Sequence, residues 1–355
     1  MTIHPTRIDD VGERELLRRL QLRIPEAPGV PVGVGDDTAL VEVPSPALVT
    51  VDSLVEDVHF RRESAPARLL GRKALAINLS DVAAMGGVGR HAIVSLCLPP
   101  DLELAWVDSL YDGLLERAAE AGVAIVGGNV SRSPGPIVID VTLIGESRGP
   151  LLRSGATPGD LVVVTGELGA AAEGFRLLEQ GARLDEGGEL AAAPAWTEPL
   201  GEAVELCVWA HLDPRPPLVL AGSLAERGLA AAGMDLSDGL SSDLADMCRQ
   251  SGVGALVDAM AVPVAGPVLE LERLRGGDAL ALALHGGEDY ELLMAVDPGD
   301  FEALEELARV WGVSVTPIGE FLEGPPDVRL TDADGGRELR PGGHDHFAAG
   351  EGPAE

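Results

Sequence analysis

The stretch RGPLLRSGATPGDLVVVT, residues 148–165, divides the chain into two parts. Its first part, 148–160, is rich in glycine and proline, a composition typical of a loop. The residues LVVVT that follow are apolar and β-branched, so they predict a buried strand over 161–165. With 355 residues, the chain has room for two domains of about 150 residues each. We therefore place a domain boundary between residues 148 and 149.

Helical and strand patterns alternate on the N-terminal side of this loop. Helices are expected over 12–20, 66–85 and 104–121, and strands over 47–51, 92–98, 124–126 and 137–144. Asp52 follows the first of these strands, and Asp81 lies near the C-terminal end of the helix over 66–85. This region, 1–148, is expected to form a mixed sheet with helices.

The C-terminal side repeats this kind of pattern. Helices are expected over 168–180, 218–227 and 241–250, and strands over 161–165, 255–257, 292–296 and 313–318. We predict an α/β (α+β) fold with two domains, the second over 149–347, followed by a disordered tail at 348–355. An LSD triplet in both NLSDVAAMG (78–86) and DLSDGLSSD (235–243) suggests that the two halves are related.

Composition excludes several classes of protein. Hydrophobic residues make up 46% of the chain, but no uninterrupted apolar run approaches the ~20 residues that span a bilayer. The N-terminus MTIHPTRIDD has no export signal, so we expect a cytoplasmic protein. Cys97, Cys207 and Cys248 form no CxxC pair and are expected to be buried small side chains.

Charge narrows the partners further. A net charge of −32 disfavours nucleic acid and anionic membranes, and it means that a phosphate ligand would need cations as intermediaries. Lys73 is the only lysine in the chain and lies in LLGRKAL, without the glycines of a GxxxxGK[ST] phosphate loop. No HRD or DFG string marks a protein kinase. Any nucleotide must therefore be bound in another way.

Aspartates in turn-like sequence are the main candidates for chemistry. They are Asp36 and Asp37 in GVGDDTAL, Asp52 in TVDS, Asp81 in NLSD, and Asp235 and Asp238 in DLSDG. Mg²⁺ is commonly held by one or two such carboxylates together with substrate phosphates, although any single aspartate here is as well explained as a cap or turn residue. Asp235, Ser237 and Asp238 would share one side of a helical turn, or Ser237 or Asp238 would cap the helix that follows.

Other candidates carry weaker signals. Gly127, Gly128 and Asn129 follow the strand over 124–126 and could form a phosphate loop. Gly286-Gly287, before Glu288, offers a similar pattern. Arg153 could pair with a nucleotide phosphate and His59 could contact an acceptor, but by default each is a solvated arginine or a satisfied histidine.

Read in order, several strings together resemble the thiamine-monophosphate kinase family, of the aminoimidazole ribonucleotide synthetase superfamily. They are GVGDDTAL, TVDSLVEDVHF, KALAINLSDVAAMGG, GGN, LLRSGATPGDLVVVTGELG, DLSDGLSSDL, HGGEDYELL and HDHF, and they run from about residue 33 to 347. The resemblance implies a two-domain homodimer that uses ATP and several Mg²⁺ ions to convert thiamine monophosphate to thiamine diphosphate. The N-terminal domain would bind ATP and Mg²⁺ and form the dimer.

The resemblance also implies site residues. It places metal ligands at Asp37, Thr50, Asp52, Asp81, Asp235 and Asp238, nucleotide contacts at Gly128, Arg153 and Ser237, and substrate contacts at His59 and Glu288. No general base is expected, because the acceptor is already a phosphate oxyanion.

Two residues depart from the family pattern. Asn129 stands where the family usually has a metal-binding aspartate, so its neutral carbonyl should weaken one metal site while it still contacts the nucleotide. His344 stands where an aromatic ring commonly stacks on the substrate, and an imidazole offers less area.

Two alternative functions remain open at this point. One is another ATP-using chemistry of the superfamily, such as activation of an amide or of selenide. The selenide version is disfavoured because no cysteine precedes Cys97 and no lysine precedes Lys73. The other is a paralogue that binds nucleotide or thiamine phosphate but has lost catalysis, which Asn129 would explain.

Overall fold

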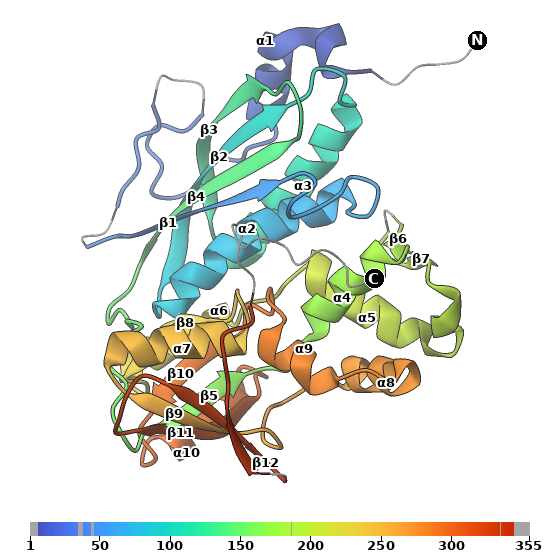
Figure 1. The fold of residues 1–355 in the computed structure, drawn as a ribbon. Coiled ribbons are helices and arrows are strands. Elements are labelled where there is room, and N and C mark those ends of the chain that lie inside the picture. The colour runs from blue at the N-terminus through green and yellow to red at the C-terminus, as the bar shows by residue number, and fades with distance from the viewer. Residues whose placement is uncertain (1–5, 35–37, 44–45, 186, 334, 344–355) are drawn as a thin grey trace.

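The structure is a computed structural model that describes residues 6–34, 38–43, 46–185, 187–333 and 335–343. It contains two large sheets, one on each side of the loop at 148–160, and Figure 1 shows one above the other with helices between them. Asp36, Asp37, His344 and the segment 348–355 lie outside the described residues, so the expectations for them stay predictions. No helix in the described ranges is long and apolar enough to cross a membrane.

The N-terminal sheet has four strands, β1 (Leu48–Val55), β2 (Val88–Leu98), β3 (Ala124–Arg132) and β4 (Val138–Glu146). Their order is β1-β4-β2-β3, with β2 and β3 parallel and the other pairs antiparallel. Apolar side chains of α2 (Ala67–Ala84) and α3 (Leu104–Ala121) join those of one sheet face in a single buried cluster. Successive strand residues point to opposite faces, so every second residue lies on the face away from α2 and α3. We call this the open face. α1 (Ile8–Gln21) packs on α3.

The predicted elements of this half are confirmed, but two of them run further than expected. β1 continues through Asp52 to Val55, and β3 continues through Gly127 and Gly128 to Arg132. The reading of Asp52 and Gly128 as residues that follow a strand was therefore wrong. A bulge in the β2–β3 pairing precedes Gly127, and a Cβ atom at Gly128 would lie 2.1 Å from the Val94 carbonyl oxygen. The glycine is needed for strand packing.

The C-terminal sheet has seven strands in the order β13-β12-β9-β11-β5-β10-β8. They are β5 (Leu161–Thr165), β8 (Ala232–Asp235), β9 (Gly254–Asp258), β10 (Leu292–Val296), β11 (Val315–Leu322), β12 (Val328–Asp332) and β13 (Gly335–Glu338). One buried cluster joins this sheet to α7 (Leu240–Ser251) and α9 (Ala279–His285), and another joins it to α6 (Leu218–Arg227) and α10 (Phe301–Val310). The sheet is thus covered on both faces.

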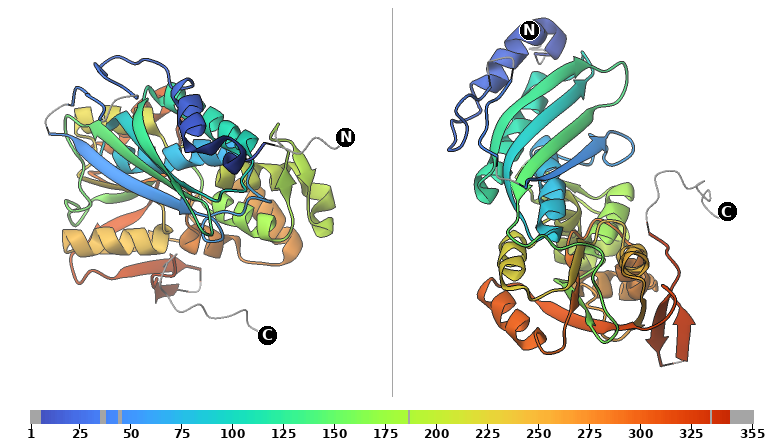
Figure 2. Two further views of the ribbon diagram at one scale, coloured as in Figure 1. Left: turned by 90° about the horizontal axis from the view of Figure 1, so that it is seen from above. Right: turned by 90° about the vertical axis from the view of Figure 1, so that its left-hand side faces the viewer.

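A further group of helices joins the two halves. It comprises α4 (Ala170–Glu179), α5 (Gly201–Leu212) and α8 (Gly266–Arg275), with the short elements β6 (Arg183–Leu184), β7 (Leu190–Ala192) and η1 (Ala195–Leu200) beside them. Leu177 of α4 and Val208 of α5 belong to the same buried cluster as Leu70 of α2. Figures 1 and 2 show α2 between the two sheets, so this helix is the element around which both halves pack.

Candidate functional site

A cavity of about 670 Å³ lies where α2 meets the C-terminal half. Seven of the predicted site residues line it: Asp52, His59 and Asp81 from the first half, and Asp235, Ser237, Asp238 and Glu288 from the second. The expectation that acids from both halves share one cleft is thus met for the described aspartates.

Three carboxylates that line this region interact electrostatically. Asp52 comes from the middle of β1, Asp81 from the last turn of α2, and Asp235 from the end of β8. Asp52 therefore lies within a strand rather than after it, whereas Asp81 lies near the end of its helix as predicted. Thr50 Oγ1 donates to Asp81, and Ser80 Oγ donates to Asp235 Oδ2 at 2.7 Å. Neighbouring hydroxyls therefore fix two of the three carboxylates.

Charge crowding changes the protonation of these acids. Burial, followed by the charges of Asp81 and Asp235, raises the pKa of Asp52 to about 7. Burial and Asp81 likewise raise the pKa of Asp235 to about 6. Asp52 and Asp81 share a hydrogen bond, so without a cation Asp52 holds a proton up to about neutral pH. A bound cation would replace that proton.

A second cavity, of about 580 Å³, shares two of the acids with the first. Thr50, Arg153, Asp81 and Asp235 all line it. Asp81 and Asp235 therefore line both cavities. The charge of Arg153 counteracts the rise in the pKa of both aspartates, which places its guanidinium within electrostatic reach of them.

The DLSDG segment is a strand end and a turn, which corrects both earlier interpretations of it. β8 ends at Asp235 and α7 begins at Leu240, with Gly239 as its N-cap residue. Asp235 and Asp238 thus do not share a helical turn, and neither Ser237 nor Asp238 caps the helix. The Gly239 N–H donates instead to Asp243 Oδ2 at 3.0 Å.

This turn is fastened to the segment GGEDY. The Glu288 N–H donates to the Ser237 carbonyl at 2.8 Å, and the Tyr290 N–H donates to the Leu236 carbonyl at 2.9 Å. A Cβ atom at Gly287 would lie 2.4 Å from the Ser237 carbonyl oxygen, so the close approach requires glycine. The two segments therefore form one unit beside the acids.

Glu288 lines the first cavity beside the turn that carries Ser237. Its φ of 66° is unusual for a residue with a side chain. Lys73 Nζ lies 3.1 Å and His211 Nδ1 2.8 Å from Glu288 Oε2. Burial alone would raise the pKa of Glu288, but the charges of Lys73 and His211 hold it well below its usual range. Glu288 is therefore a carboxylate.

His59 also lines this cavity, on the turn after β1. Its Nδ1 accepts a hydrogen bond from the Val55 N–H at 3.0 Å. A backbone N–H can only donate, so the neutral ring carries its proton on Nε2.

Two predicted residues lie apart from the acids within one chain. Asn129 is in cross-strand register with Ser95, which pairs with Asp140. These residues belong to the open face of the sheet, whereas Asp52 belongs to the face that meets α2. Gly128 is exposed in the edge strand β3. The ligand contacts assigned to Gly128 and Asn129 stay predictions.

The donor set suits a hard divalent cation. Among the residues that the structure describes, no three His, Cys, Asp or Glu side chains form a ready-made cage for one metal ion. Mg²⁺ does not need such a cage, because it usually takes one or two carboxylates, several waters and substrate phosphates. Asp52, Asp81, Asp235 and the Thr50 hydroxyl offer oxygen donors at a point of uncompensated negative charge.

Sequence reasoning missed four residues that line this cavity or hold its carboxylates, namely Lys73, Phe175, His211 and Tyr290. The sequence did mark Lys73 as a candidate, because a single lysine in a chain that otherwise uses arginine is unusual. His211 carried none, because its contact with Glu288 joins segments far apart in sequence.

Comparisons with known proteins show the family to which the chain belongs. Residues 35–147 match the model of the AIR synthase related protein N-terminal domain, and residues 157–330 match that of the C-terminal domain. A thiamine-monophosphate kinase from Rhodopirellula baltica is 33% identical over 87% of this chain and 89% of its own length.

Two solved structures are also similar to the chain. That of thiamine-monophosphate kinase from Stenotrophomonas maltophilia K279a has a TM-score of 0.76 and 34% identity, covering 89% of this chain and 95% of that one. AaThiL complexed with AMPPCP and TMP has a TM-score of 0.73 and 29% identity, covering 97% of this chain and all of that one. This chain belongs to the thiamine-monophosphate kinase family.

Proposed function

We propose that this protein transfers the γ-phosphate of ATP to the phosphate of thiamine monophosphate, giving thiamine diphosphate and ADP. The observation that supports this most directly is that two cavities share Asp81 and Asp235. A reaction between two phosphorylated ligands needs two binding spaces that meet at a point where cations can gather. Family membership supports the same reaction.

The two cavities differ in the groups that they offer. The 580 Å³ cavity contains Arg153 and Thr50, and we assign it to the nucleotide phosphates. The 670 Å³ cavity contains His59, Ser237 and Glu288, and we assign it to thiamine monophosphate, with Ser237 near the transferred group. A carboxylate such as Glu288 suits the thiamine end, which carries a cationic thiazolium and an aminopyrimidine.

The proposed reaction does not need a general base. An acceptor phosphate oxygen forms a bond to the γ-phosphorus while the bond from that phosphorus to the β,γ-bridging oxygen breaks. The nucleophile is already an oxyanion, so no side chain has to remove a proton. The protein's part is to hold the two anions in line and to offset their repulsion. Asp52, Asp81 and Asp235 would hold Mg²⁺, which supplies the positive charge between the phosphates.

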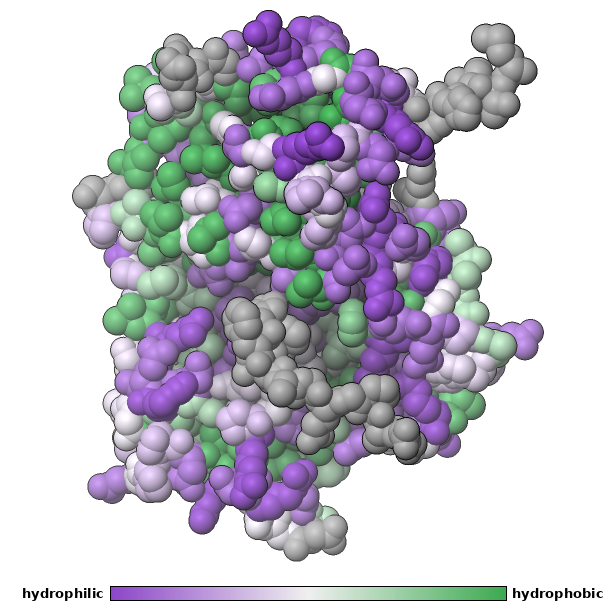
Figure 3. Space-filling model, turned by 45° about the horizontal axis from the view of Figure 1, so that its top comes forward, coloured by the Kyte–Doolittle hydropathy of each residue, from purple (hydrophilic) through white to green (hydrophobic). Residues whose placement is uncertain are grey.

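We further propose that the protein is a homodimer built on the open face of the N-terminal sheet. Val49, Val51 and Ile93 on this face are 67%, 55% and 40% exposed. Figure 3 shows apolar side chains gathered on the upper part of the molecule, over this sheet. An apolar patch of this kind marks an interaction surface. Light scattering should give a dimer mass, and Val51→Glu should give a monomer.

We also propose that the protein is located in the cytoplasm.

A turnover assay tests the proposed reaction. Purified protein is incubated with ATP, Mg²⁺ and thiamine monophosphate, and thiamine diphosphate is measured by chromatography. Unphosphorylated thiamine serves as the control acceptor and should give no product. Tight binding of both ligands without product would instead support a paralogue that has lost catalysis. Neither binding nor product would point to another chemistry of the superfamily.

A further inference from the structure

The lysine that is unique in the sequence is buried at the junction of the two halves. Lys73 is 2% exposed and comes from α2, whereas Glu288 and His211 come from the C-terminal half. A buried ammonium is costly unless it is paired, so the Lys73–Glu288 contact has to persist in the folded protein. Glu288 itself keeps 28% of its side chain exposed and lines the 670 Å³ cavity.

The geometry leaves part of Glu288 available to a ligand. Both contacts, at 3.1 Å from Lys73 Nζ and 2.8 Å from His211 Nδ1, fall on Oε2. Across the described residues, no hydrogen bond to Oε1 is formed. Oε2 thus accepts a hydrogen bond from Lys73 and lies within contact distance of His211 Nδ1, while Oε1 can receive a donor or a cation from the cavity.

The backbone of this segment also needs support. Glu288 and Tyr290 adopt φ values of 66° and 52°, in the left-handed region that costs free energy for residues with side chains. The hydrogen bonds to Ser237 and Leu236 and the contact with Lys73 hold the segment in this conformation. Strain maintained in this way is common at ligand sites.

Helix α2 connects this contact to the acids. Lys73 lies eight residues before Asp81, which is ~12 Å along the helix axis. Ser80, next to Asp81, binds Asp235. One rigid helix thus fixes both the carboxylate at the ring end of the acceptor cavity and the acids at its phosphate end.

We infer that Lys73 and His211 are positioning residues that hold the Glu288 carboxylate in place for the ring end of the acceptor. This inference rests on the proposed function, which assigns that cavity to thiamine monophosphate. The competing explanation is that Lys73 and Glu288 form an interdomain ion pair with no role in ligand binding.

The test measures kcat and the KM of each substrate in wild type and variants. Lys73→Met should raise KM for thiamine monophosphate by roughly tenfold or more, because a charge-assisted contact is lost, and should leave KM for ATP within about twofold. Glu288→Gln should have a similar effect. In the double variant the two effects should not add, because Lys73 acts through Glu288. Arg68→Met, on the same helix but in an exposed ion pair, is the matched control and should leave both KM values unchanged.

His211 provides a second test if Lys73→Met is too unstable to purify. His211→Asn keeps an N–H near the position of Nδ1 and should retain the wild-type KM, whereas His211→Leu should raise KM for thiamine monophosphate. Equal changes in both KM values, no change in either, or additive effects in the double variant would overturn the inference. If wild type makes no thiamine diphosphate, the proposed function fails instead, and calorimetric binding of thiamine monophosphate to the same variants still tests the role of Lys73.

Discussion

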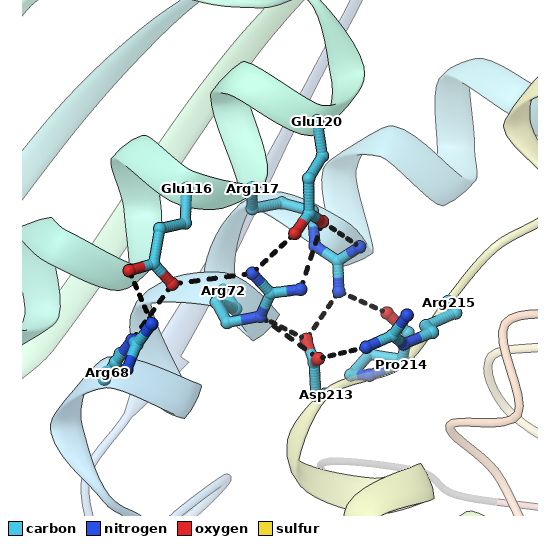
Figure 4. A network of polar contacts seen from close by, with 8 residues as sticks. All are labelled: Arg68, Arg72, Glu116, Arg117, Glu120, Asp213, Pro214 and Arg215. Carbon is cyan, nitrogen blue, oxygen red and sulfur yellow. Dashed lines mark hydrogen bonds and ion pairs between the residues drawn. The ribbon is translucent and has the colours of Figure 1, made fainter. Parts of the chain in front are cut away.

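Two clusters of charge lie at the junction of the two halves, and they are built differently. In the first, Arg72 and Arg117 share Asp213 and Glu120, with contacts such as 3.0 Å from Arg72 Nε to Asp213 Oδ1 and 2.9 Å from Arg72 Nη1 to Glu120 Oε1 (Figure 4). In the second, Asp52, Asp81 and Asp235 interact electrostatically, and the charge of Arg153 acts on Asp81 and Asp235.

This difference indicates a structural role for the arginine cluster and a ligand-binding role for the aspartate cluster. The arginine cluster satisfies its own charges, so it holds α2 and α3 to the end of α5 and leaves little for a ligand to do. The aspartate cluster keeps uncompensated negative charge, which disfavours the ionised state until a cation arrives. Both clusters use α2, through Arg72 and Asp81. The same helix therefore carries a fixed brace at one end and a site prepared for ligands at the other.

Breaking the brace should give the largest effect on stability. Asp213 has a side chain that is 1% exposed and contacts two arginines that are themselves buried. Asp213→Asn leaves those guanidinium groups without their counter-charge, so the free energy of unfolding should fall by about 3–5 kcal/mol. Denaturant titration measures this. The control is Arg215→Ala, because the Arg215 side chain belongs to the same cluster but is 73% exposed. This variant should change the free energy of unfolding by less than about 1 kcal/mol.

Removing one acid from the second cluster should reduce activity without reducing stability. Asp52→Asn is expected to lower kcat by about 100-fold or more, because a group that gathers positive charge at the phosphates is lost. In the absence of Mg²⁺ at pH 8, its stability should equal or exceed that of wild type, because a repulsive charge has gone. Activity within about threefold of wild type, or a loss of stability comparable to that of Asp213→Asn, would mean that Asp52 belongs to the fold rather than to the metal site.

The contrast also explains what the sequence could predict. The strands and helices of the N-terminal half follow from apolar periodicity, and they suffice to place Asp81 near a helix end. The strand β8 was missed because its four residues, AGMD, carry too little pattern. Asp235 was consequently assigned to a helical turn, although its role in the acidic cluster was predicted from the family resemblance.

Contacts between the halves were beyond sequence reasoning. Lys73 contacts Glu288, and Arg72 contacts Asp213, across 215 and 141 positions of the chain. No local propensity specifies such pairs, which depend on how α2 packs between the two sheets. Gly128 shows the reverse case, where a glycine interpreted as a ligand loop has a packing reason in the β2–β3 pairing.

The acidic cluster should make the metal-free protein less stable as the pH rises. Asp52 and Asp235 have pKa values of about 7 and about 6 in the folded protein, against an ordinary value of 3.8. The folded state therefore keeps protons that the unfolded state has released, and the free energy of unfolding should fall between about pH 4 and pH 8, by about 1–2 kcal/mol after screening. Asp243, with a pKa of about 8, acts in the same direction.

Thermal unfolding in chelator across this pH range measures the effect. Asp52→Asn should flatten the curve, and Mg²⁺ should restore stability most strongly at the high-pH end. A curve that rises with pH in wild type, or that keeps its full slope in Asp52→Asn, would contradict the crowding of charge at Asp52.

The smallest effect is expected at Asn129, which lies on the opposite face of the sheet from Asp52 in the same chain. Any contribution to a metal site must then be made to a partner protomer, which the proposed dimer would supply. Asn129→Asp should lower the Mg²⁺ concentration for half-maximal turnover by about threefold. This corresponds to a change in binding free energy of less than about 1 kcal/mol. Ser131→Asp, two residues along the same edge strand, adds the same charge and should not change it. The gain should also vanish in the Val51→Glu background, because a monomer has no partner protomer whose acids that carboxylate could join. A gain that persists in the monomer would contradict this, because the sheet register places Asn129 and Asp52 of one chain on opposite faces.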